Sequence, residues 1–117
     1  MTPEVLEAVK EVASWYPLPE SALNQCAAAR EHLVEKLRHL GFTDFQLLEV
    51  RGPVGTTRPH PNLQAGHQVL RIGAEVVDVT WAQIDVDGDR PFKIYPSIES
   101  LRQDWTDVRD WDTGEPI

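Results

Sequence analysis

The hydrophobic pattern changes from helical to extended at Gly41, and this change limits the possible fold more than any other feature. Before Gly41, apolar residues recur every three or four positions, which is the spacing of one face of a helix. After it, apolar and polar residues alternate in short runs separated by glycine and proline, which is typical of strands and turns. Helices and strands that are segregated along a chain predict an α+β fold. The length of 117 residues suits a single domain over residues 1–117.

Two helices are expected before Gly41. The first covers residues 3–15, with Thr2 as the N-cap and Pro3 in the first helical position, and two following prolines end it. The second begins near residue 21 or 24, with Asn24 as the expected N-cap, and ends at residue 40, where Gly41 follows as the C-terminal cap.

The remaining residues predict a small antiparallel sheet and a short closing helix. We expect strands at residues 44–50, 66–72, 75–81 and 92–95, and a helix at residues 97–105. Residues 51–62 are expected to be a loop, residues 85–90 a turn, and the acidic tail after residue 106 irregular.

The charge of the chain narrows the classes of partner. Nineteen acidic residues against eleven Lys and Arg give a net charge of -8, which repels phosphate backbones and anionic lipid headgroups. We therefore expect neither nucleic acid nor a membrane as partner, and a basic protein partner would fit better.

The cysteine content and the hydrophobic runs indicate where such a protein is found. The single cysteine excludes an internal disulfide and a cysteine-rich zinc site. No apolar run approaches the roughly 20 residues that cross a bilayer, and the first residues lack the form of a secretory signal. We expect a soluble protein that is cytoplasmic as made. Export as an effector would need a route other than a recognisable signal peptide.

Residues 66–81 predict a hairpin that brings a histidine next to an aspartate. If the turn at Gly73 has two or four residues, Ile72 lies opposite Glu75, whereas a turn of three residues would place His67 and Asp78 on opposite faces. His67 and Asp78 then lie diagonally on the same face, within reach of an imidazole–carboxylate hydrogen bond.

Cys26 lies at the start of the second expected helix, where free backbone N–H groups and the helix dipole favour a thiolate over a thiol. A neighbouring imidazole could take the proton of Cys26, and a carboxylate could hold that imidazole in place. A different interpretation stays open, because Cys26 also continues the apolar stripe of its helix and would then be an inert core residue.

Metal sites have weak support in the sequence. His60 and His67 are separated by a proline-containing loop and have no evident third ligand. Asp85, Asp87 and Asp89 resemble a calcium loop, but the glycine at position 88 comes too early, so a turn is the better interpretation. No metal and no other cofactor is expected.

Several segments resemble the papain-like fold of small bacterial toxin and effector domains, over roughly residues 20–105. They are Asn24-Gln25-Cys26 at the start of an alanine-rich helix, Gly66-His67-Gln68-Val69-Leu70, Val76-Val77-Asp78-Val79-Thr80, and Gln83. The segment from Tyr95 to Trp105 is also similar to the end of the second papain-fold toxin family. These domains share a Cys-His-Asp order with glutamine deamidases, transglutaminase-like enzymes and arylamine acetyltransferases.

The resemblance implies a central helix that carries the cysteine and packs on a small antiparallel sheet. It makes Cys26 the nucleophile, His67 the general base and Asp78 the orienting acid. In papain a glutamine six residues before the nucleophile donates to the oxyanion, and Glu20 occupies that position here. Gln25 and Gln83 are the candidate oxyanion donors instead.

The resemblance further implies a thiol hydrolase or acyl-transfer enzyme, either a glutamine deamidase or a protease, that acts as a bacterial toxin or effector. Its partners would be a protein substrate and a cognate immunity protein. The alternative is a small acidic binding protein without catalysis, such as an immunity protein, to which the size and charge fit equally well.

Overall fold

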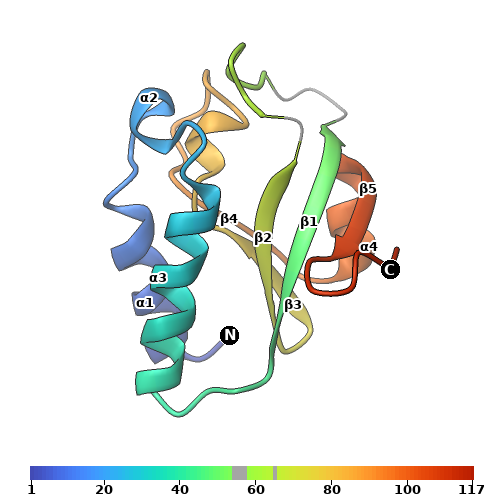
Figure 1. Ribbon diagram of the computed structural model, residues 1–117. Coiled ribbons are helices and arrows are strands. Elements are labelled where there is room, and N and C mark those ends of the chain that lie inside the picture. Colours follow the sequence, from blue (N-terminus) through green and yellow to red (C-terminus); the bar gives the residue numbers. More distant parts are fainter. Residues whose placement is uncertain (54–57, 65) are drawn as a thin grey trace.

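The computed structural model describes residues 1–53, 58–64 and 66–117, which form helices and one antiparallel sheet (Figure 1). The α+β class predicted from the sequence is therefore confirmed. The elements in chain order are α1 (Pro3–Ala13), α2 (Pro19–Ala22), α3 (Cys26–His39), β1 (Phe45–Pro53), β2 (His67–Ile72), β3 (Glu75–Asp78), the short 3₁₀ helix η1 (Trp81–Gln83), β4 (Lys93–Tyr95), α4 (Ile98–Asp104) and β5 (Trp105–Asp110). None of the helices within these described ranges combines the length and the apolar character that a bilayer crossing requires.

Helix α1 begins as predicted and ends two residues early. The Thr2 hydroxyl accepts a hydrogen bond from the Val5 amide at 3.3 Å, and Pro3 occupies the first turn, where its missing N–H costs nothing. One face of α1 is buried against the rest of the protein, so tertiary packing stabilises this short helix.

The start of α3 differs from the prediction. A separate short helix, α2, precedes it, and Asn24 is not the N-cap but adopts a left-handed conformation with φ 57°. Gln25 takes the N-cap position, so Cys26 is the first residue of α3 rather than the second. The reason is a contact distant in sequence, because the Asn24 amide donates to the Gln83 side chain at 2.8 Å.

The end of α3 follows the prediction. Gly41 has φ 83°, its N–H donates to Arg38 at 3.0 Å, and the next amide, of Phe42, donates to Leu37 at 2.9 Å. These two bonds satisfy helix carbonyls in the arrangement that favours glycine after a helix.

The sheet has the strand order β4-β3-β2-β1-β5, and all neighbouring strands are antiparallel. In the β2–β3 hairpin Ile72 lies opposite Glu75 and Leu70 opposite Val77, so the turn has two residues and the register expected for an even-numbered turn is confirmed. Strand β3 ends at Asp78, three residues before the predicted end, because the chain then turns into η1.

Each face of the sheet is covered by its own hydrophobic cluster. Helices α1 and α3 pack on one face, against Leu70, Val77 and Val79 (Figure 1). The opposite face carries Val69 and Val76 and packs against residues of η1, α4 and β5.

The C-terminal segment corrects the prediction of an irregular tail. Residues from Trp105 onward form β5, which pairs with β1, and β1 itself extends to Pro53 instead of ending at residue 50. Only Trp105 and Val108 of β5 are buried, so this edge strand shows little of the alternation by which a strand is detected in sequence. Its backbone pairing with β1 holds it in place.

Candidate active site

Three elements meet at one end of the sheet and bring together the residues that the sequence singled out. Cys26 is the first residue of α3, His67 the first residue of β2 and Asp78 the last residue of β3. All three are buried, with exposed fractions of 8%, 1% and 0%. Gln25 and Ala27, on either side of Cys26, are exposed, so the cluster lies just beneath the surface.

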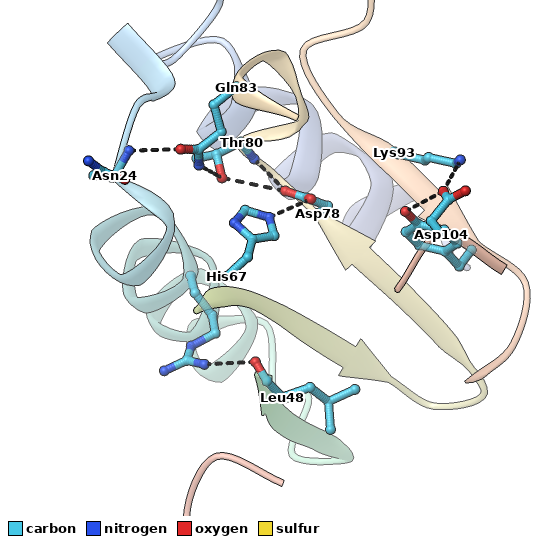
Figure 2. A network of polar contacts seen from close by, with 10 residues as sticks. Asn24, Leu48, His67, Asp78, Thr80, Gln83, Lys93 and Asp104 are labelled. Carbon is cyan, nitrogen blue, oxygen red and sulfur yellow. Dashed lines mark hydrogen bonds and ion pairs between the residues drawn. The ribbon is translucent and has the colours of Figure 1, made fainter. Parts of the chain in front are cut away.

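His67 and Asp78 form the hydrogen bond that the hairpin register predicts. The Nε2 atom of His67 lies 2.6 Å from the Oδ2 atom of Asp78 (Figure 2). Burial of His67 would lower its pKa, but the adjacent Asp78 charge and this hydrogen bond outweigh burial and raise the pKa to about 10. The ring is therefore held as an imidazolium at neutral pH.

The other ring nitrogen of His67, Nδ1, is available to the thiol. It is buried and has no hydrogen-bond partner among the residues that the structure describes. The Cys26 thiol lies close enough to the ring that each group shifts the pKa of the other. Catalytic hydrogen bonds are often long until a substrate binds, so the missing bond at Nδ1 fits a proton donor at rest.

The pKa of Cys26 is lowered. Burial alone would raise this pKa, and the charge of Asp78 raises it as well. The His67 ring and the backbone N–H of Gln68 together lower the pKa by more than these two effects raise it. The helix start adds to this effect, because the first N–H groups of α3 have no partner within the helix.

The end of β3 explains why the Gln68 amide is free for the sulfur. In a hairpin with a two-residue turn, Ile72 and Glu75 exchange both hydrogen bonds, and bonding residues then alternate along the strand. Gln68 therefore directs its N–H toward β3, and β3 ends at Asp78, before the position that would accept it. The amide instead acts on Cys26, where it helps to lower the pKa of the thiol.

The second oxygen of Asp78 is bound by a chain of buried polar groups. Oδ1 accepts from the Thr80 amide at 3.0 Å, and the Thr80 hydroxyl accepts from Gln83 Nε2 at 2.9 Å. Gln83 Oε1 in turn accepts from the Asn24 amide at 2.8 Å. Figure 2 shows this chain running from Asn24 through Gln83 and Thr80 to Asp78 and His67.

Gln83 thus has both ends of its amide engaged, and the structure places it between the acid and the segment that precedes Cys26. The sequence suggested Gln83 as an oxyanion donor, and nothing in the local pattern pointed to this bridging position. Gln25, the other candidate donor, directly precedes Cys26, is exposed, and makes no side-chain cap on α3.

Asn24 also fixes the segment before β2. Its Oδ1 accepts from the Gln64 amide at 3.0 Å, and its Nδ2 donates to the Asn62 carbonyl at 3.4 Å. The left-handed backbone of Asn24 lets one residue serve the Gln83 bridge and this loop at once.

Trp105 is a residue of the site that sequence reasoning missed. Its ring stacks on the His67 ring, with 5.2 Å between centroids and 16° between planes, and its exposed fraction is 1%. It lies at the junction of α4 and β5, and only the fold brings it to His67. The stacking limits rotation of the imidazole.

Metal ligation finds no support in the described ranges 1–53, 58–64 and 66–117, where no three His, Cys, Asp or Glu side chains gather suitably. His60 Nδ1 accepts from the Asn62 amide at 3.1 Å, and Asp87 pairs with Arg58 at 2.6 Å. Residues 85–88 form a turn closed by the bond from the Gly88 amide to the Asp85 carbonyl at 3.1 Å.

Comparisons with known proteins identify no relative. No family model, no curated protein and no solved structure matches this chain. The function has therefore to be inferred from the geometry of the site.

Proposed function

We propose that this protein is a papain-like cysteine hydrolase or acyl-transfer enzyme that acts on a carboxamide or peptide bond of a protein substrate. The observation that carries the proposal is the meeting of a lowered-pKa thiol, Cys26, with an imidazole that a buried carboxylate holds. A core cysteine without a chemical role would have its pKa raised by burial.

In the first half of the reaction, Cys26 thiolate attacks the carbonyl carbon, and the electrons of the C=O bond move to the oxygen. When the C=O bond re-forms, the C–N bond breaks, and His67 gives the proton at Nδ1 to the departing ammonia or amine. The product is a thioester on Cys26 and a neutral imidazole.

In the second half, water attacks the thioester, and His67 takes the proton of that water. The C–S bond then breaks and the Cys26 thiolate leaves, which restores the initial ion pair. An amine in place of water would give transamidation by the same steps. Asp78 keeps the ring oriented and stabilises its positive charge throughout.

The oxyanion that forms in both halves needs donors near the sulfur. The Cys26 N–H lies at the start of α3, where helix N–H groups have no intrahelical partner, and the exposed side-chain amide of Gln25 directly precedes it. We assign the oxyanion site to these two groups. Gln83 is assigned a positioning role, because its amide is already bonded at both ends.

The biological setting that fits such a site is a bacterial toxin or effector that modifies glutamine in a target protein and is held in check by a cognate immunity protein. This part of the proposal rests on the resemblance of residues 20–105 to papain-fold toxin domains. A small acidic binding protein without catalysis, such as an immunity protein, is the competing function.

The direct test is alkylation of the folded protein by iodoacetamide below pH 7. We expect fast modification of Cys26, and we expect His67→Ala to slow it strongly. Modification that occurs only after denaturation would contradict the proposal.

A second test separates the enzyme from a binding protein. Expression of the chain in a cell should be harmful, and Cys26→Ala should relieve the harm. Equal harm from the variant would favour binding. Ammonia release from a glutamine-containing polypeptide, or new peptide termini, would then distinguish deamidation from proteolysis.

A further inference from the structure

Arg30 lies one turn after Cys26 on the same side of α3, and its environment is unusual for an arginine. Its exposed fraction is 5%, although it is charged. Its Nη1 donates to the Leu48 carbonyl at 3.3 Å, and its guanidinium lies 5.3 Å from the centre of the Trp111 ring. Its Nε is buried and has no hydrogen-bond partner in the described residues.

Arg30 also has no counter-ion of its own. None of the ion pairs in the described ranges includes Arg30. Burial lowers the pKa of Arg30, and the charges of Cys26, Asp112, Glu31 and Glu49 oppose that shift. A buried cation that is bonded only to a neutral carbonyl is costly, because buried charges are ordinarily paired with an opposite charge.

The free part of the guanidinium has the geometry that a carboxylate uses. With Nη1 bonded to Leu48, neither Nε nor Nη2 of Arg30 carries a hydrogen bond within the described residues, and because Nε is fully buried the side chain must shift for a carboxylate to contact both groups. Two parallel N–H groups on one edge match the two oxygens of a carboxylate.

A ligand reaches Arg30 through a groove between α3 and β1. The groove has a volume of about 640 Å³, and its lining includes Ala28, Arg30, Leu47 and Trp111. Trp111 is 43% exposed and offers an apolar wall. Exposed Glu31, Glu35 and Arg38 also line the groove, and the two glutamates disfavour a polyanion, so a single carboxylate is the ligand that fits.

We propose that Arg30 binds a carboxylate of the substrate next to the carbonyl that Cys26 attacks. Four residues along a helix span about 6 Å, which places this carboxylate roughly one residue away from the reacting group. The substrate class is therefore a carboxamide or peptide bond that neighbours an acidic side chain or a chain-terminal carboxylate. This inference rests on the proposed thiol chemistry of Cys26.

The experiment compares two alkylating reagents that differ in charge, iodoacetate and iodoacetamide. With each, a bond forms between the Cys26 sulfur and the reagent carbon while iodide leaves. The thiolate fraction affects both rates equally, so the ratio of the two rates reports on the binding of a carboxylate beside the sulfur. We expect Arg30→Gln to lower the iodoacetate-to-iodoacetamide ratio about tenfold.

The matched control is Arg109→Gln, which removes the same charge from an exposed arginine of β5 that pairs with Asp107 at 2.8 Å. It should leave the ratio unchanged. An unchanged ratio in folded Arg30→Gln, or an equal fall in Arg109→Gln, would overturn the role of Arg30 while leaving the thiol chemistry intact. Failure of both reagents with the folded wild type would instead overturn the proposed function, and this inference with it.

If Arg30→Gln does not fold, the same ratio of rates is measured in Arg30→Lys. It keeps the positive charge and loses the paired N–H edge, so we expect a smaller fall in the same ratio. A ratio equal to that of the wild type in Arg30→Lys would show that the paired edge binds no carboxylate.

Discussion

Two carboxylates near β3 and β4 hold cations in different ways, and Figure 2 shows both. Asp78 lies directly opposite Lys93 in the β3–β4 ladder, yet the two are not partners. Asp78 is fully buried and binds His67, whereas Lys93 turns to Asp104 at 2.5 Å. The Asp104 carboxylate also accepts from the Tyr95 hydroxyl at 2.8 Å.

The two pairs differ in whether the cation has a group left that can take part in chemistry. Lys93 lies 4.6 Å from the Trp81 ring centre and 4.8 Å from that of Tyr95, so its charge is used entirely for packing. His67 retains a second nitrogen beside the thiol. We therefore interpret the Asp104 pair as structural and the Asp78 pair as chemical.

The largest effect should come from Asp78→Asn, measured against Asp104→Asn. Without the Asp78 charge, the pKa of His67 falls and the Cys26 thiolate loses its cation. The rate of alkylation by iodoacetamide at pH 6 should fall by about 100-fold or more. Asp104→Asn should stay within about twofold of the wild type. Equal losses in the two variants would remove the distinction between the pairs.

The pH dependence of alkylation sharpens the same comparison. Because the pKa of Cys26 is lowered from its ordinary value of 9.0, the rate should already be high below that pH and level off early. In His67→Ala, burial acts without the cation, so the midpoint should move upward and the rate at pH 7 fall about tenfold or more. Lys93→Met is the control, and a midpoint that moves as far in this variant would contradict the assignment.

Gln83→Leu tests whether the bridge to Asn24 positions the site. The substitution leaves the Asn24 amide without its acceptor and the Thr80 hydroxyl without the Gln83 donor, at a cost of about 1–3 kcal/mol in the free energy of unfolding. We expect the alkylation rate to fall about tenfold as the start of α3 shifts relative to His67.

The matched control for the bridge is Gln46→Leu. Gln46 also has both ends of its amide engaged, with Asp110 at 2.6 Å and Arg71 at 3.0 Å, but it joins strands of the sheet. It should lower stability and leave the alkylation rate unchanged. A similar rate loss in both variants would point to general loosening of the fold.

The smallest effect concerns stability as a function of pH. The pKa of His67 is about 10 in the folded protein and near 6.5 in the unfolded chain, so its contribution is complete below pH 6.5 and is lost as the pH rises toward 10. The lowered pKa of Cys26 changes the stability with pH in the opposite direction. The measurement therefore uses Cys26→Ala, in which only the contribution of His67 remains. Its unfolding free energy in urea should fall by more than about 1 kcal/mol between pH 6.5 and 9.5. Adding Asp78→Asn should remove most of this fall, and adding Asp104→Asn should not.

Features set by neighbouring residues could be predicted from the sequence. The α+β class, the Gly41 cap and the hairpin register all depend on short spacings, and each is confirmed. The hydrogen bond between His67 and Asp78 follows from that register. Strand β5 was not predicted because backbone pairing with β1 holds this edge strand in place. Its side-chain pattern does not indicate a strand.

By itself, the sequence determined a cysteine near the start of a helix and a histidine and aspartate on one hairpin. Only the tertiary structure decided that Cys26 begins α3, that Gln83 reaches Asn24 and that Trp105 stacks on His67. The physical reason is distance along the chain. Local periodicity fixes which face a side chain takes, whereas contacts between residues tens of positions apart form only when the packed core brings their elements together.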